Sequence, residues 1–202
     1  MRSIFTVTSP AAQTSLLTIE ELRAAAGVTG SSQDAALTAL GLQLSEAIAS
    51  SCGVAWDGEH TRTLLSEGCE EAFTVRRPSS RLRLARRPVT AIASVTVDGD
   101  VIDSAEYEID KASGLLSRVC GDWPCGKTVV AFTAGFSTAP GALKLAASKL
   151  ATALYSETGR DPNLKRVDIP DVMEKEFWVA PTNDPLLSTE IQDLLAPYKQ
   201  VW

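Results

Sequence analysis

Few residues of this chain could carry chemistry, and the single histidine limits the possibilities most. Every Ser/His/Asp or Cys/His scheme would have to use His60, which stands in the polar, loop-like run 57–61. The sequence contains neither a G-x-G-x-x-G motif nor the lysine motif of a phosphate-binding loop. Acidic residues are plentiful, but no short signature singles out a pair of carboxylates. We therefore expect no catalytic residue, no metal and no cofactor, with a small carboxylate enzyme as the alternative.

The four cysteines do not indicate a metal or redox site. Cys120 and Cys125 are the only close pair, in the run Cys-Gly-Asp-Trp-Pro-Cys, and this spacing matches no zinc or redox pattern. A structural zinc site would need four well-spaced ligands. Two interpretations stay open for the four residues: free thiols in a reducing compartment, or a disulfide between Cys120 and Cys125.

A cluster of arginines is the most distinctive charge feature of the chain. Six fall within a dozen residues: Arg76, Arg77, Arg81, Arg83, Arg86 and Arg87. They could be the solvated side chains of an edge strand, where charge discourages aggregation. They could equally form an electrostatic surface for an acidic partner or for DNA that passes nearby. The chain as a whole has a formal charge of −6, which argues against a dedicated nucleic-acid binder but permits non-specific contact.

The elements that position these residues begin with a strand followed by a long helix. The β-branched and aromatic run 129–133 predicts the strand, and Gly135 ends it. Pro140 can open the helix, which we expect over about 140–158. Its apolar positions recur at helical spacing: Leu143, Ala146, Ala147, Leu150, Ala151 and Leu154. This helix is predicted to lie in the core.

Two more helices are predicted before the strands, over about 18–26 and 32–52. The first begins with a capping box at Thr18 and Glu21, and Leu17 and Leu22 can form its hydrophobic staple. The apolar residues of 1–16 recur at neither helix nor strand spacing, so we predict a flexible leader there. Residues 17–159 would form the core.

Short strands are predicted over about 61–135. The residues 62–65 and 73–75 could pair across a turn at Glu67-Gly68, and Leu82 and Leu84 alternate with arginines as in a half-buried strand. Asp98-Gly99 is the strongest hairpin signal, and a second turn is predicted at 112–114. The expected fold class is α+β, mainly α: a helical hairpin and a long core helix with a β-hairpin-rich insertion and an extended C-terminal arm.

The C-terminal region 160–202 is predicted to be an arm with a docking helix. Leu187, Ile191, Leu194 and Leu195 share one helix face, and the chain ends in the aromatic run 197–202. Because chain ends are normally polar and mobile, this tail should either fold back on its own core or dock on another protein. No apolar run approaches the ~18 residues of a membrane span, and we expect the protein to be made in the cytoplasm.

The order of these motifs resembles the head–tail connector (adaptor) proteins of long-tailed bacteriophages, prophages and gene transfer agents. The resemblance covers roughly 16–158 and a common ending at 194–198. The motifs that carry it are the capped helix 17–22, the helix end at Cys52-Gly53, and the runs 87–92, 95–99, 107–110, 114–116, 132–136 and 140–147 with Tyr155.

This resemblance implies a virion protein of the neck that forms a ring, usually twelve-fold, beneath the portal. The ring would extend the DNA channel and join the portal to a stopper or tail-joining protein. The expected portal-binding anchors are Phe177, Trp178, Ile191, Leu194, Leu195, Tyr198 and Trp202. The arginine cluster could face a partner or the DNA in the channel. A stopper or tail-completion protein, or a non-viral binding module, is an alternative.

Overall fold

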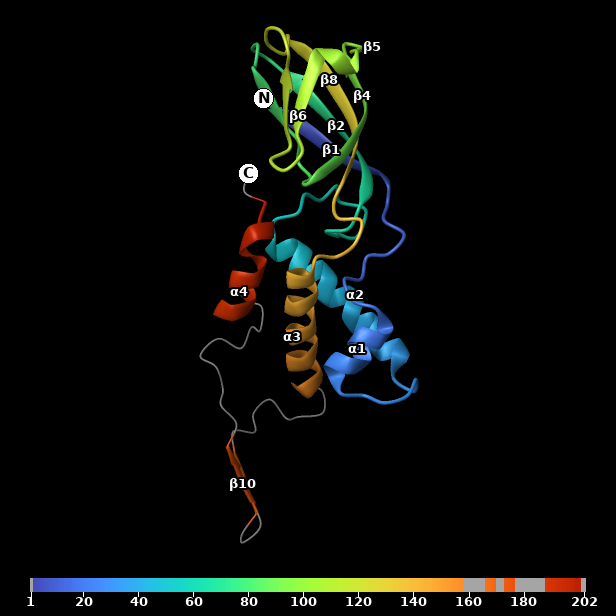
Figure 1. Ribbon diagram of the computed structural model, residues 1–202, viewed down its shortest axis with the longest axis vertical. Helices are drawn as coiled ribbons and strands as arrows, with labels where there is room; N and C mark the ends of the chain where they lie inside the picture. The colour runs from blue at the N-terminus through green and yellow to red at the C-terminus, as the bar shows by residue number, and fades with distance from the viewer. Residues whose placement is uncertain (1, 158–165, 170–172, 177–187, 201–202) are drawn as a thin grey trace. The chain divides into compact units, whose positions relative to one another are not determined.

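The computed structural model describes residues 2–157, 166–169, 173–176 and 188–200. The chain divides into two compact units (Figure 1). The strand unit consists of Met1–Thr14, Ser45–Pro140 and Tyr198–Trp202, and the helical unit consists of Ser15–Leu44 and Gly141–Pro197. About 33% of the structure is helical and 31% is strand. The prediction of a mainly helical fold is therefore wrong.

A five-stranded antiparallel sheet of order β1-β2-β8-β4-β5 forms the larger part of the strand unit. Its strands are β1 (Arg2–Ser9), β2 (Glu67–Val75), β8 (Gly126–Ala134), β4 (Val89–Val97) and β5 (Asp100–Val101). The prediction of a flexible leader over 1–16 is wrong for β1, which pairs along β2 as an edge strand. Its Ser- and Thr-rich sequence gives no clear strand signal. The strand is held in place by its backbone hydrogen bonds to β2 and by the buried Val7.

The predicted hairpin between 62–65 and 73–75 is also wrong, because Glu67–Val75 forms the single strand β2 between β1 and β8. Glu67 and Glu71 lie on the core side of this strand, where both are buried. Two buried glutamates break the apolar alternation that would have indicated a strand.

A second antiparallel sheet, of three strands, completes the strand unit in the order β3-β7-β6. Its strands are β3 (Arg81–Arg83), β7 (Leu115–Arg118) and β6 (Tyr107–Asp110), and the short 3-10 helix η1 (Ser104–Glu106) precedes β6. Both predicted turns are confirmed. Asp98 and Gly99 have positive φ angles of 51° and 99° between β4 and β5, and the turn at 112–114 joins β6 to β7.

The core of the strand unit is apolar and contains one large aromatic anchor. Trp123 is fully buried, and its indole N–H donates to the carbonyl of Leu116 at 3.2 Å. Each large apolar side chain buried here contributes roughly 1.5–3 kcal/mol. The remaining members of the core are Cys69, Phe73, Val75, Leu82, Leu84, Val89, Val95, Leu116, Val130, Phe132 and Ala134.

The helical unit contains α1 (Ile19–Ala26), α3 (Gly141–Glu157), α4 (Thr189–Leu195) and the first part of α2 (Asp34–Ser51). The predicted capping box of α1 is confirmed: the hydroxyl of Thr18 accepts from the backbone N–H of Glu21, and the Glu21 carboxylate accepts from that of Thr18. The apolar stripe of α3 is buried except for Leu154, which is half-buried, and α1 and α4 pack against this helix.

The C-terminal region also contains two strands that the sequence did not define. β9 (Arg166–Ile169) and β10 (Met173–Glu176) pair with each other as an antiparallel ribbon. The 3-10 turn η3 (Ala196–Tyr198) follows α4. Among the described residues, no helix has both the length and the apolar composition needed to cross a membrane.

Candidate functional site

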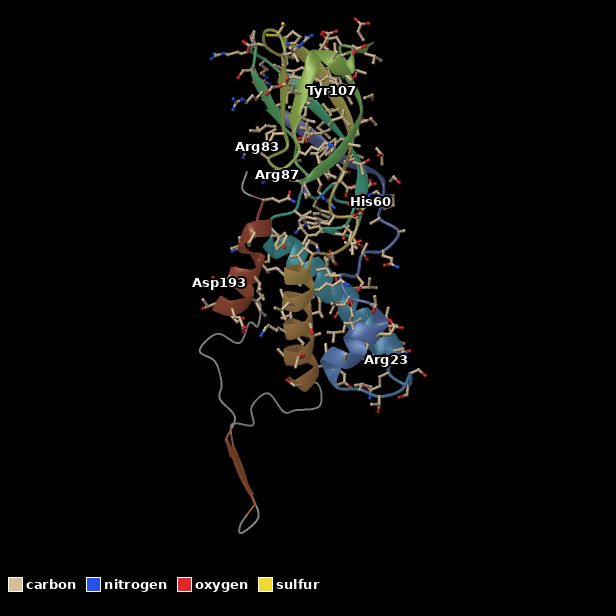
Figure 2. The ribbon with its side chains drawn as sticks, viewed as in Figure 1. Arg23, His60, Arg83, Arg87, Tyr107 and Asp193 are labelled. Carbon is tan, nitrogen blue, oxygen red and sulfur yellow. The ribbon has the colours of Figure 1, made fainter. Side chains whose placement is uncertain are left out.

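The environment of His60, labelled in Figure 2, is that of a loop anchor. Its ring Nδ1 lies 2.7 Å from a carboxylate oxygen of Asp57. Asp57 also accepts backbone N–H groups from Val7, Glu59 and His60. Burial would raise the pKa of Asp57, but these donors hold it well below its ordinary value. Because all of its donors lie in one loop or on β1, the Asp57 carboxylate stabilises the conformation of this loop.

We expect the imidazole of His60 to titrate above its ordinary pKa of 6.5, because Asp57 stabilises the charged ring. The stability that comes from this raised pKa is complete below pH 6.5 and is lost as the pH rises through the pKa of the folded state. Proton NMR of the ring against pH would measure this value. In Asp57→Asn the pKa of His60 should fall. An equal pKa in both proteins would show that Asp57 is not the cause of the raised value.

The cysteines are free thiols, and the two that are buried are unsuited to nucleophilic chemistry. Burial raises the pKa of Cys52 to about 11 and that of Cys69 to about 12, so both stay protonated at neutral pH. Cys120 and Cys125 are exposed and unbonded. Within the described part of the chain, no group of three or more His, Cys, Asp or Glu side chains could hold a metal ion.

The buried carboxylates of the strand unit are also occupied by structural contacts. Glu67 forms an ion pair with Arg86, and both side chains are almost completely buried. The Arg86 guanidinium donates further to the carbonyl oxygens of Thr63 at 2.5 Å and Ala55 at 3.2 Å. Glu71 accepts the backbone N–H of Ala85 at 2.7 Å, while burial raises its pKa. These groups fix β2 to the segment after β3.

This ion pair divides the predicted arginine cluster. Four members are exposed: Arg76, Arg77, Arg81 and Arg83. Arg81 and Arg83 flank the buried Leu82 on β3, as the alternation predicted. Arg87 is half-buried, and Figure 2 shows Arg83 and Arg87 on the same side of the strand unit. Arg86 is buried against Glu67, so it cannot belong to a surface for a partner or for DNA.

The helical unit has a shallow groove of about 490 Å³ along α1 and α3. An ion pair of 2.8 Å between Lys144 and Glu21 crosses it, and the Thr152 hydroxyl donates to the carbonyl of Ala25. These contacts tie the two helices together. The groove contains neither a histidine nor a cysteine that could act on a substrate.

The predicted portal-binding residues differ in their accessibility. Ile191 and Leu195 are buried, on a helix that packs against α3, and Leu194 is half-buried. Figure 2 shows Asp193 on the exposed side of α4. Tyr198 is half-buried and makes an edge-to-face contact with Phe136, with ring centroids 5.7 Å apart. Phe177, Trp178 and Trp202 lie outside the described residues. Ile191 and Leu195 could contact a portal only if α4 left α3.

Sequence reasoning missed a run of acidic residues in the strand unit. Six exposed acids follow one another with no basic residue between them: Asp98, Asp100, Asp103, Glu106, Glu108 and Asp110. They are divided in pairs among three short elements, the β4–β5 hairpin, η1 with its N-cap, and β6, so no single local pattern contains them. A count of charge by segment would have found the run.

Comparison with solved structures finds the same fold in particles of one kind. A chain in the "Neck of empty GTA particle computed with C6 symmetry" shares 20% identity with a TM-score of 0.60. A chain in the "Virion of native gene transfer agent (GTA) particle" shares 19% identity with a TM-score of 0.63. A chain in the "Neck of native GTA particle computed with C12 symmetry" shares 18% identity with a TM-score of 0.61.

In all three comparisons, the match covers 98% of this chain and 96% of the other. No family model matches the sequence, and no curated protein matches it. At these identities, the likeness shows a common fold over almost the whole length of both chains.

Proposed function

We propose that the protein is a structural subunit of the neck of a phage-like particle. In this role it is a head–tail adaptor: it forms a ring beneath the portal, extends the DNA channel and receives a stopper or tail-joining protein. It is a virion protein without enzymatic activity. The observation that carries the proposal is the full-length likeness to chains in gene transfer agent necks and virions.

The chemistry of the described residues supports a structural role. The single histidine holds a loop, the buried thiols are protonated at neutral pH, and the buried carboxylates bind Arg86 or a backbone N–H. A catalytic group would need a free proton acceptor or nucleophile beside a place for a substrate. A neck subunit instead needs surfaces for its neighbours, and the exposed charges of the strand unit provide candidates.

The portal contact is proposed to come from the C-terminal aromatic residues Phe177, Trp178 and Trp202. Large aromatic side chains dominate the binding energy of many protein interfaces. Ile191 and Leu195 instead have the role of holding α4 on α3. A variant that deletes the C-terminal region would remove this helix together with the aromatic residues, so substitutions test the proposal more cleanly.

The proposal is tested by mixing the full chain with its cognate portal ring, followed by co-sedimentation and negative-stain imaging. We expect the wild-type protein to decorate the portal as a second ring. Replacing Phe177, Trp178 and Trp202 together by alanine should weaken binding at least about tenfold. Trp56→Ala is the matched control, because this tryptophan is 55% exposed in the strand unit and should not affect portal binding.

The outcomes of this binding experiment distinguish the portal contact from the adaptor role. If the triple variant binds as well as the wild type, the aromatic residues are not the portal contact, although the adaptor role stands. If the wild type does not bind the portal but binds a preformed portal–adaptor complex, the protein is a stopper. If it binds neither, the proposed function is wrong.

A further inference from the structure

The edge strand β1 leaves part of its backbone without hydrogen-bond partners. β1 is the outermost strand of the five-stranded sheet and pairs only with β2. The N–H of Val7 donates to the Asp57 carboxylate at 3.1 Å, so it points away from β2. Backbone groups alternate in direction along an antiparallel strand, so the N–H groups of Ser3 and Phe5 point the same way. Among the described residues, neither of these two groups has an acceptor.

The side chains of β1 fix the strand in place while one face stays open. Val7 is buried, and Phe5 packs against the core of the strand unit, 5.9 Å from the Arg86 guanidinium. Ile4 points to the other face and is 60% exposed. Because β1 is already held as a strand, a chain that pairs with it would not have to order it first.

The other edges of the two sheets in the strand unit carry features that discourage strand pairing. β5 has two residues, and β4 beside it is interrupted by two register shifts. β3 and β6 have three and four residues, and each exposes two charged side chains. β1 has eight residues without a proline, a lysine or an acidic residue. Short strands, bulges and charges are the features by which proteins prevent strand addition, so β1 is the edge that stays open.

The open edge is basic at the end where β1 begins. Arg2 lies opposite Thr74 on β2, and Arg76 and Arg77 follow the end of that strand. All three arginines are exposed, and none forms an ion pair with another described residue. A strand added to β1 would therefore meet positive charge at this end and the apolar Ile4 beside it.

We propose that β1 is a docking site for an extended segment of another protein, which adds to the sheet as a strand antiparallel to β1. The N–H groups of Ser3 and Phe5 donate to the backbone carbonyls of this segment. An apolar side chain of the segment packs on Ile4, and an acidic residue at its C-terminal end lies beside Arg2. The proposal goes beyond the adaptor role and does not depend on it.

Backbone chemistry and charge select this occupant over DNA and over a second copy of the chain. DNA could meet the arginines, but it has no peptide groups to accept from Ser3 and Phe5. The β1 strand of a second copy has peptide groups, but it has no acidic residue to place beside Arg2. An acidic extended segment satisfies both requirements. The antiparallel direction continues the pattern of the sheet and is slightly the more stable of the two.

Two synthetic peptides of about eight residues test the docking site, since a strand of this length can span β1. Both alternate valine with threonine, and they carry two glutamates at the C-terminal or at the N-terminal end. Amide hydrogen exchange of the full chain, followed by NMR, measures binding. We expect the first peptide to protect the amides of Ser3 and Phe5, whereas those of Ile4 and Thr6 already face β2 and should change little. The reversed peptide should bind at least about tenfold more weakly.

Substitutions on β1 distinguish backbone pairing from charge. Ser3→Pro removes one outward N–H, and Ser3→Ala is its matched control, because both lose the hydroxyl that bonds to Glu71. Ser3→Pro should bind the first peptide at least about threefold more weakly than Ser3→Ala. Arg2→Glu should weaken binding about tenfold. Lys111→Glu makes the same change of charge at an exposed position just after β6 and should leave binding unchanged.

The inference is overturned if excess peptide leaves the exchange of Ser3 and Phe5 unchanged, or if both peptides bind equally. Protection of these amides that rises with protein concentration, in the absence of peptide, would assign the edge to a second copy instead. Retention of duplex DNA that Arg2→Glu abolishes, without peptide binding, would assign the arginines to DNA. Peptide binding is measured without a portal, so the docking site and the proposed function can fail independently.

Discussion

Replacing Arg86 by methionine should lower the free energy of unfolding by about 3–5 kcal/mol. The guanidinium is 2% exposed and its partner Glu67 is 1% exposed, so the substitution leaves a buried carboxylate without its counter-charge. It also removes the donors to the carbonyl oxygens of Thr63 and Ala55. Such a loss costs far more than breaking a surface ion pair, which contributes at most about 1 kcal/mol.

A double-mutant cycle distinguishes the ion pair from simple packing. Urea denaturation would compare the wild type with Arg86→Met, Glu67→Gln and the double variant. We expect the double variant to be more stable than Arg86→Met, because removing the carboxylate charge removes the desolvation penalty. Arg81→Met is the matched control on the exposed side of β3 and should change stability by less than about 0.5 kcal/mol. If the losses of unfolding free energy in the two single variants simply add up in the double variant, Arg86 and Glu67 do not stabilise each other as an ion pair.

Replacing Gly135 by alanine should lower the free energy of unfolding by about 3 kcal/mol or more, since backbone strain and a steric overlap add together. Gly135 has a φ of +105°, which L residues rarely adopt. A Cβ at this position would lie 2.3 Å from the carbonyl oxygen of Leu65 and 3.0 Å from that of Leu64. Both neighbours are backbone atoms, so relief requires the chain to shift. The N–H of Gly135 donates to the carbonyl of Pro88 at 2.8 Å, which limits such a shift.

Gly99→Ala is a matched control for this prediction. Gly99 has a similar φ of +99°, but a Cβ added to it would meet no atom within 4 Å. Its replacement should therefore cost only the backbone strain, about 1–2 kcal/mol. Thermal or urea denaturation of both variants would measure the difference. Equal destabilisation would show that strain in φ, and not the overlap with Leu65, explains the cost at Gly135.

Local signals in the sequence predicted the features that depend on neighbouring residues. The capping box of Thr18 and Glu21 and the Asp98-Gly99 turn need only a few consecutive residues, and the structure has both. The alternation around Leu82 likewise indicated β3 with its arginines exposed. The free energy of such elements comes largely from backbone geometry and short-range hydrogen bonds, which a single sequence displays.

The features that the sequence did not reveal depend on partners far along the chain. β1 is a strand because β2 lies beside it, although the two are separated by more than fifty residues. Only the end of β2, residues 73–75, was predicted as a strand, because Glu67 and Glu71 occupy core positions that only Arg86 and the backbone of Ala85 make acceptable. These omissions explain why the fold was predicted as mainly helical.

For the candidate site, the sequence by itself determined that any Ser/His/Asp or Cys/His scheme would have to use His60 and that arginines would cluster. Composition and spacing suffice for both statements. Only the tertiary structure decided that Arg86 is buried against Glu67 and that His60 holds a loop. The physical reason is that burial and charge complementarity depend on which side chains meet after the strands pair, and distant residues decide that pairing.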